Sequence, residues 1–138
     1  MIFNSVDVLR PDKQGYPIIS ISKIASILII FLKAMKNFYY FINYQGGISG
    51  FIELKDATDT VILRIFSDRI DIWGEYKKSL LSKYKWDLNL DTIILYNDLF
   101  LQDYIIEKIK EIYWSFGYRP EPEKLYKDYL RDAGWLIE

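Results

Sequence analysis

The segment KYKWDLNLDTI at residues 83–93 decides the fold, because two kinds of side chain alternate along it. Tyr84, Trp86, Leu88 and Leu90 take the even positions, and Lys, Asp or Asn takes the odd ones. A period of two is typical of a β-strand with one covered face and one wet face. The segment therefore predicts a strand that needs another layer of the protein against its apolar side.

A long helix upstream can supply that layer. Ser20 or Ser22 is a suitable N-cap, and we expect the helix to run to about residue 44 and to end at Gly46-Gly47. The polar side chains form only a narrow stripe, and a helix of this kind must be covered on several sides. We therefore expect the central helix of the domain to lie on a sheet. The polar stripe consists of Ser22, Ser26, Lys33 and Asn37.

The remaining segments complete one α+β domain over residues 1–138, with an antiparallel sheet of about four strands followed by two C-terminal helices. The Pro and Gly residues near the start predict an extended N-terminal segment. Asn97 or Asp98 is a suitable cap for the first C-terminal helix, and Gly117 is its expected stop. The expected elements are the extended segment 1–19, strands 47–56, 59–68, 69–76 and 83–93, and helices 98–116 and 122–132.

Composition excludes several kinds of site. The chain has no Cys and no His, so it cannot form disulfides, thiolate metal sites or a Ser-His-Asp triad. The formal net charge of −1 disfavours a strongly basic nucleic-acid binder. Few Gln and Met beside many Ile, Lys, Glu and Tyr suit a thermophile, and equally an AT-rich genome.

The N-terminal region predicts a cytoplasmic protein without a membrane span. Residues Met1–Pro11 contain no long apolar run of the kind found in signal peptides. The most apolar segment, Ile24–Leu32, has nine residues before Lys33, which is too short to cross a bilayer.

Carboxylate chemistry is the least favoured hypothesis. Glu53-Leu54-Lys55 matches half of a metal-dependent nuclease signature, but residues 14–52 contain no Asp or Glu to complete it. Asp71 and Glu75 can share one side of a strand, which turn and surface positions explain more simply. We therefore expect no catalytic, cofactor-binding or metal-binding residues, and a metal-dependent enzyme using Glu53 or Asp71 is the third alternative.

The aromatic segment KEIYWSFGYRPEPEKLY at 110–126 allows two interpretations. Tyr113 and Phe116 continue an apolar helix stripe and are expected in the core, whereas Trp114 points away from it. Trp114 is then either covered by the last helix or, with Tyr118, exposed as an anchor for a partner, because Trp and Tyr dominate binding hot spots. The candidate partner contacts are Trp114, Tyr118, Trp135, Tyr39 and Tyr40.

A basic cluster supports the second function hypothesis. Lys77, Lys78, Lys83 and Lys85 are interleaved with aromatic residues and could track a nucleic-acid backbone. A solvated basic strand edge that discourages strand pairing explains the same pattern. Charge is also segregated along the chain, since residues 13–52 have four lysines and no acid, whereas residues 98–138 have nine acids and six bases. Segregation of this kind favours oriented docking with a charged partner.

Three segments, KWDLNLDTI, IIEKIKEIYWSFGY and the final AGWL, carry a family resemblance. With them, residues 18–138 resemble the C-terminal region of archaeal DNA-binding proteins of the Schlafen/AlbA-type ATP-binding class. That family's ATP-binding and DNA-associated functions belong to an N-terminal domain, which has no counterpart here, so no functional residue carries over. The resemblance implies an accessory module in a nucleic-acid-associated or antiviral defence complex, for which small archaeal partners of Argonaute-type proteins are an example.

The leading hypothesis is therefore a non-enzymatic accessory subunit that binds a larger protein. Direct nucleic-acid binding through the basic cluster is the alternative, and self-association into a homo-oligomer is left open. No cofactor is expected.

Overall fold

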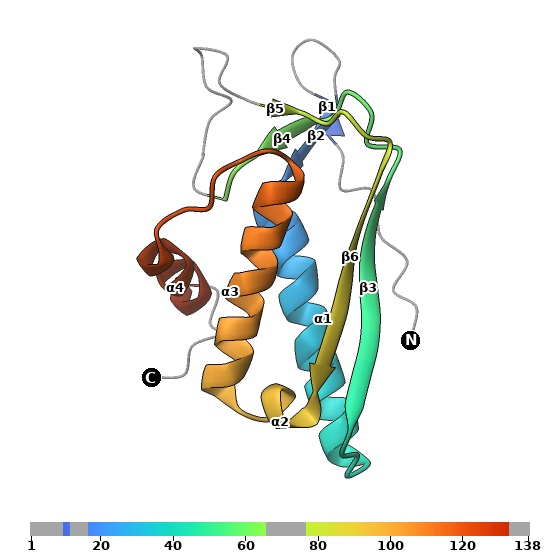
Figure 1. Cartoon of the computed structure of the whole chain (residues 1–138), viewed down its shortest axis with the longest axis vertical. Helices are drawn as coiled ribbons and strands as arrows, with labels where there is room; N and C mark the ends of the chain where they lie inside the picture. Colours follow the sequence, from blue (N-terminus) through green and yellow to red (C-terminus); the bar gives the residue numbers. More distant parts are fainter. Residues whose placement is uncertain (1–9, 12–16, 66–76, 133–138) are drawn as a thin grey trace.

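The protein has the α+β fold expected from its sequence (Figure 1). The computed structural model describes residues 10–11, 17–65 and 77–132, and every structural statement below concerns these residues. The elements, in chain order, are β1 (Arg10–Pro11), β2 (Pro17–Ser20), α1 (Ile21–Phe41), β3 (Gly47–Lys55), β4 (Val61–Leu63), β5 (Lys77–Lys78), β6 (Lys83–Asp91), α2 (Thr92–Leu95), α3 (Asp98–Ser115) and α4 (Glu123–Asp132).

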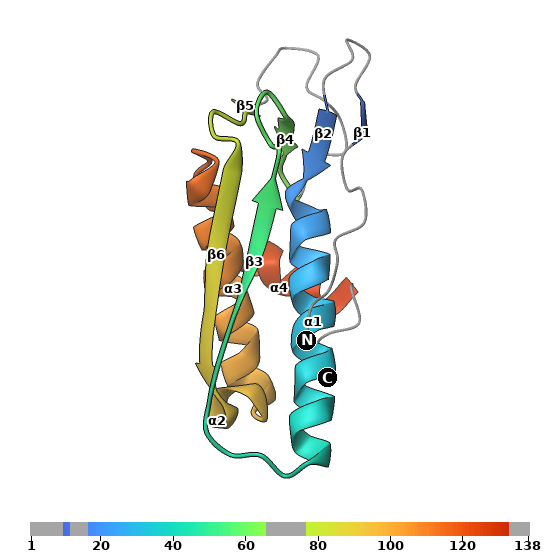
Figure 2. The ribbon, with the colours of Figure 1, turned by 90° about the vertical axis from the view of Figure 1, so that its right-hand side faces the viewer.

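β3 and β6 pair antiparallel along their whole length and form one side of the molecule (Figures 1 and 2). We name this two-stranded sheet the hairpin, although β4 and β5 lie between its strands in the sequence. The register runs from Gly47 opposite Asp91 to Lys55 opposite Lys83. Along β6, burial alternates as the sequence predicted, so Tyr84, Trp86 and Leu88 face the core and the odd positions face outward. The apolar face of this hairpin is the surface on which the helices lie.

α1 is the predicted central helix. The Ser20 side chain caps it by accepting a hydrogen bond from the backbone N–H of Ser22, which settles the choice between the two serines. Its buried side chains recur every three or four residues and form one stripe that faces the core. The buried residues are Ile21, Ile24, Ala25, Leu28, Ile29, Leu32 and Met35.

The end of α1 differs from the prediction. The helix stops at Phe41, and Asn43, not Gly46-Gly47, takes the left-handed conformation with φ 55°. The backbone N–H groups of Asn43 and Tyr44 donate to the carbonyls of Tyr40 and Tyr39, which is a Schellman C-cap. Asn tolerates this backbone region better than other residues with a side chain, which explains why it serves here without a glycine.

α3 runs antiparallel to α1 (Figure 1). It packs on β6 through an aromatic cluster. The Phe116 ring centroid lies 4.6 Å from that of Tyr84 and 5.7 Å from that of Trp86. Trp86 Nε1–H also donates to the Ser115 hydroxyl at 2.8 Å. Asn97 is the N-cap and Gly117, with φ 77°, ends the helix, both within the alternatives that the sequence allowed. Tyr113 and Phe116 are buried, as predicted.

The strands do not form the single antiparallel sheet that was expected. β1, β2, β4 and β5 make a second sheet, in which β2 pairs parallel with β4 (Ile18 opposite Val61). β4 is shorter than the predicted strand 59–68, and the predicted strand 69–76 lies outside the described residues. A parallel pair depends on how α1 folds back over the domain, and no local pattern in the chain specifies that.

α2 was also missed, since the strand predicted over 83–93 ends at Asp91. The Asp91 carboxylate accepts a hydrogen bond from the backbone N–H of Ile93 and so caps a single helical turn. This turn reverses the chain between β6 and α3.

By length and composition, α1 is the one helix in the described part of the chain that could cross a membrane, and it is longer than the nine-residue run considered above. Core helices of globular domains have the same properties, and the buried stripe of α1 shows it in that role here. One third of its most apolar window is buried, so much of its apolar surface faces outward.

Candidate interaction surfaces

The structure separates the five aromatic residues that were expected to contact a partner. Trp114 (64% exposed) and Tyr40 (73% exposed) are accessible, whereas Tyr39 is half-buried and Tyr118 is buried. Trp135 lies outside the described residues. Trp114 sits near the C-terminal end of α3, and Tyr40 lies at the other end of the molecule, beside the start of that helix (Figure 1). These residues therefore do not form one surface.

The expectation that Tyr118 is an exposed anchor is wrong. Its hydroxyl donates to the Ile62 carbonyl at 2.6 Å and accepts a hydrogen bond from the Lys77 backbone N–H at 2.9 Å. The Gly117 turn folds Tyr118 back so that its N–H donates to the Tyr113 carbonyl. Burial raises the pKa of the Tyr118 hydroxyl. Tyr118 thus joins the turn after α3 to β4 and β5.

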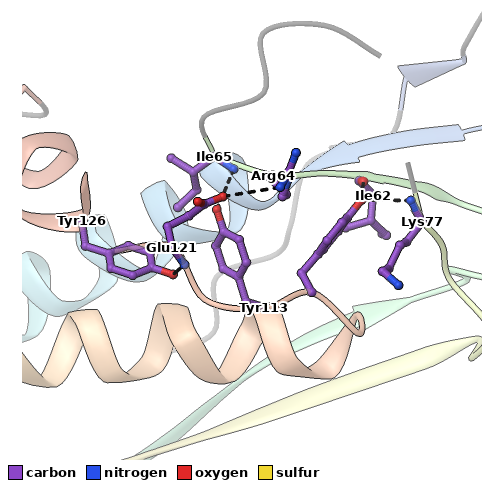
Figure 3. A network of polar contacts seen from close by, with 8 residues as sticks. Ile62, Arg64, Ile65, Lys77, Tyr113, Glu121 and Tyr126 are labelled. Atoms are coloured by element: carbon purple, nitrogen blue, oxygen red, sulfur yellow. Dashed lines mark hydrogen bonds and ion pairs between the residues drawn. The ribbon is translucent and has the colours of Figure 1, made fainter. Parts of the chain in front are cut away.

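Two further tyrosines connect the same region (Figure 3). The Tyr113 hydroxyl accepts a hydrogen bond from the Ile65 backbone N–H at 3.1 Å, and the Tyr126 hydroxyl accepts one from the Glu121 backbone N–H at 2.7 Å. Burial raises the pKa of both hydroxyls. These tyrosines are structural: the Tyr126 ring packs edge-to-face on the Tyr113 ring with centroids 5.9 Å apart, so α4 lies on the Tyr113 side of α3. Trp114, the next residue, remains exposed.

α1 ends and α3 begins at the same end of the molecule (Figure 1). Several large apolar residues of this end have exposed side chains. Individual exposures run from 48% for Phe38 to 87% for Phe41. α2 contributes to the same end, so three helices meet there. We name this surface the distal end; it consists of Phe38, Tyr40, Phe41, Ile42, Ile93, Leu99 and Phe100.

Specific contacts hold the helices of the distal end together. Lys36 Nζ lies 2.7 Å from a carboxylate oxygen of Asp98, which joins α1 to α3. The Tyr40 ring packs edge-to-face on the Tyr96 ring with centroids 5.7 Å apart, and the Tyr96 hydroxyl donates to the Tyr44 carbonyl. These contacts fix the positions of α1, α2 and α3 relative to one another at the distal end.

Sequence reasoning selected Tyr40 but missed the rest of the distal end. A signal was present, because residues 38–42 read Phe-Tyr-Tyr-Phe-Ile. Consecutive residues on a helix point about 100° apart, so five large apolar side chains in a row cannot all face one core. A run of this kind at a helix end indicates either a second layer or an exposed surface.

A shallow depression of about 280 Å³ lies beside this end, lined by Gln45, Gly46, Asp91, Thr92, Ile93 and Tyr96. The polar groups that shape it are bonded to one another. Gly46 N–H donates to the Thr92 hydroxyl, and Thr92 N–H donates to the Gly46 carbonyl. The depression therefore offers few unmet hydrogen-bonding groups to a ligand.

The basic cluster is partly neutralised by acids. Lys83 Nζ lies 3.3 Å from Glu53, and Lys85 Nζ lies 3.9 Å from Asp87 and 4.6 Å from the centre of the Phe51 ring. Lys77 is exposed and its ammonium lies 5.8 Å from the Tyr118 ring, while Lys78 is half-buried. Tyr84 and Trp86 face the core, so no aromatic side chain of β6 is available to stack on bases.

The carboxylates considered for metal chemistry are not assembled among the described residues. No group of three or more acidic side chains there lies close enough to hold a metal ion, and Asp71 lies outside them. Burial would raise the pKa of Glu53, but the hydrogen bonds and charges of Lys83 and Lys55 outweigh it and lower that pKa. Glu53 is therefore an ion-pair partner of two lysines on the outer face of the hairpin.

Comparison of the chain with protein-family models, with curated proteins and with solved structures finds no match in any of the three.

Proposed function

We propose that this chain is a non-enzymatic interaction subunit that binds a larger protein through the distal end. The carrying observation is the exposure of Phe38, Tyr40, Phe41, Ile42, Ile93, Leu99 and Phe100 at one end of the molecule. Neither Trp114 nor the basic cluster offers a comparable set of side chains.

The size of the apolar area supports this assignment. At roughly 180 Å² for each large side chain, the exposed fractions leave about 800 Å² of the distal end accessible. The largest apolar patch on a typical monomer is about 300–600 Å². A protein–protein interface of standard size takes about 800 Å² from each partner. The summed exposed area of these seven residues is therefore comparable to one partner's share of such an interface.

The chemistry of the distal end favours a protein over a nucleic acid. Its side chains are aromatic and aliphatic, and the ion pair of Lys36 with Asp98 between them carries no net charge to attract a phosphate backbone. Aromatic residues are enriched and lysine is depleted in the centres of protein interfaces. The family resemblance would place the partner in a nucleic-acid-associated or defence complex, and the cytoplasm is the expected location; both remain predictions.

Affinity capture from the source cells tests the proposal. The tagged chain is compared with Phe41→Glu and Leu99→Glu, which place a charge in the interface without changing a buried side chain. We expect the unmodified chain to retain one defined partner at stoichiometric level and both variants to lose it. Leu80→Glu is the matched control, since Leu80 is 91% exposed on the link between β5 and β6.

Circular dichroism and the unfolding midpoint of each variant should match the unmodified chain. A defined partner that survives both Phe41→Glu and Leu99→Glu, or that is lost with Leu80→Glu, would overturn the assignment to the distal end. Turnover of a substrate by the pure chain would overturn the non-enzymatic role.

A further inference from the structure

α1 carries a second apolar stripe on the side away from the core. Its members are spaced by three or four residues, as in two heptads of a coiled-coil helix. Ile30 is 62% exposed and Phe41 is 87% exposed, although the whole helix is packed in the fold. We name this set the outer stripe of α1; it consists of Ile27, Ile30, Ala34, Phe38 and Phe41.

The dimensions of the outer stripe suit one helix. The fourteen helical steps from Ile27 to Phe41 span about 21 Å at about 1.5 Å per residue, or roughly four helical turns. Ala34 at the centre is small, which allows a second helix axis to approach closely. Ile30, Phe38 and Phe41 alone expose about 350 Å², a little under half of what each partner contributes to a standard interface.

The charges of α1 define the partner further. α1 contains three lysines and no acid, and no acid occurs anywhere in residues 14–52. Lys36 is bonded to Asp98 on the side of α3, and the side chains of Lys23 and Lys33 are exposed. An apolar stripe on a helix whose own charges are all positive complements a helix with acidic flanks.

We propose that the partner contributes an amphipathic helix with acidic flanks that packs lengthwise on the outer stripe of α1. This inference deepens the proposed function, because it names the segment of the partner and extends the interface from the distal end along α1. Phe38 and Phe41 belong to both surfaces.

A second copy of the chain is a poorer occupant. Two α1 helices packed together would bring Lys23 and Lys33 of each copy near the other copy without any acid on either helix, and like charges across such an interface are unfavourable.

Peptide binding to the pure full-length chain tests the inference. The probe is a fluorescent helical peptide of about three heptads with Leu at a and d and Glu at e and g; its counterpart has Lys at e and g. We expect the Glu peptide to bind at least tenfold more tightly at about 0.05 M salt, and the preference to shrink at about 0.5 M because salt screens the charges.

Variants of the chain locate the site. Ile30→Glu should weaken binding of the Glu peptide at least tenfold, and Trp114→Glu, at a position of similar exposure on α3, should leave it unchanged. Absence of binding, equal binding of the two peptides, or an unaffected Ile30→Glu would overturn the inference. Sedimentation showing a dimer that Ile30→Glu dissociates, or flotation with phosphatidylserine vesicles that Ile30→Glu abolishes, would overturn it in favour of those occupants.

Ile30 also separates this inference from the proposed function, because it lies outside the distal end. If affinity capture loses the partner with Leu99→Glu but retains it with Ile30→Glu, the distal end stands and the helix on α1 does not.

Discussion

Tyr40 and Tyr118 show how one residue type takes opposite roles in this protein. Tyr40 exposes most of its surface at the distal end, while Tyr118 is buried with both hydrogen-bonding functions of its hydroxyl satisfied. The Tyr118 bonds reach Ile62 and Lys77, which are distant in sequence and belong to β4 and β5. The Ile62 carbonyl and the Lys77 N–H lie far from Tyr118 in the sequence, so the residues around Tyr118 could not predict its burial.

Tyr118→Phe should lower the free energy of unfolding by about 1–3 kcal/mol, because it leaves the Ile62 carbonyl and the Lys77 N–H without their buried partner. Tyr40→Phe removes the same hydroxyl from an exposed position and should change stability by less than about 0.5 kcal/mol. Denaturant unfolding of the two variants measures the difference. Equal effects would contradict the assignment of Tyr118 as a structural residue.

At the scale of elements, both long helices end in a left-handed residue followed by a Schellman hydrogen bond. Gly117 ends α3 as predicted, while α1 uses Asn43 three residues before the expected glycine pair. Glycine is the usual residue for this conformation, so the sequence predicted that Gly46-Gly47 ends α1, whereas Asn43 does so in the structure. Helix starts were more predictable, because Ser20 and Asn97 cap through their own side chains.

Substitutions at these ends test the backbone argument. Asn43→Ala should destabilise the protein by about 1 kcal/mol, because alanine is strained at positive φ, and Asn43→Gly should be neutral or stabilising.

Gly117→Ala should lower the free energy of unfolding by about 1–2 kcal/mol, because alanine is strained at positive φ there too. No clash adds to this strain, since a Cβ at Gly117 meets only Lys77 side-chain atoms at ordinary contact distances. Gly47→Ala is the control, because its Cβ would have no atom within 4 Å and its φ is not positive. Thermal unfolding that ranks Gly47→Ala as the most damaging would contradict this account.

At the scale of the whole molecule, the outer face of the hairpin is electrically balanced. Its three lysines, Lys55, Lys83 and Lys85, are matched by Glu53, Asp87 and Asp91, because the register of β3 and β6 brings the two strands together. The cluster of four lysines that appears in the linear sequence is thus spread over β5 and β6, and acids of the hairpin accompany two of its members.

This balance predicts weak nucleic-acid binding by the pure chain. For a labelled single-stranded DNA oligonucleotide, we expect little binding at low salt and a shallow dependence on salt. Four lysines acting together on phosphates would give a slope of log K against log salt of about −3. A slope of that size, abolished by Lys77→Glu with Lys83→Glu, would restore direct nucleic-acid binding as the function.

The sequence by itself determined the α+β class, the central helix, the alternating face of β6 and the core positions Tyr113 and Phe116, because periodicity and caps act within one segment. Only the tertiary structure decided that β2 pairs parallel with β4, that Tyr118 is buried, and that side chains from α1, α2 and α3 gather at the distal end. These features depend on contacts between segments 40 to 60 residues apart, such as Ile18 with Val61, Ile62 with Tyr118, and Tyr40 with Tyr96. A local pattern indicates which apolar side chains are expected to be buried, whereas the packing of distant elements decides which of them remain exposed.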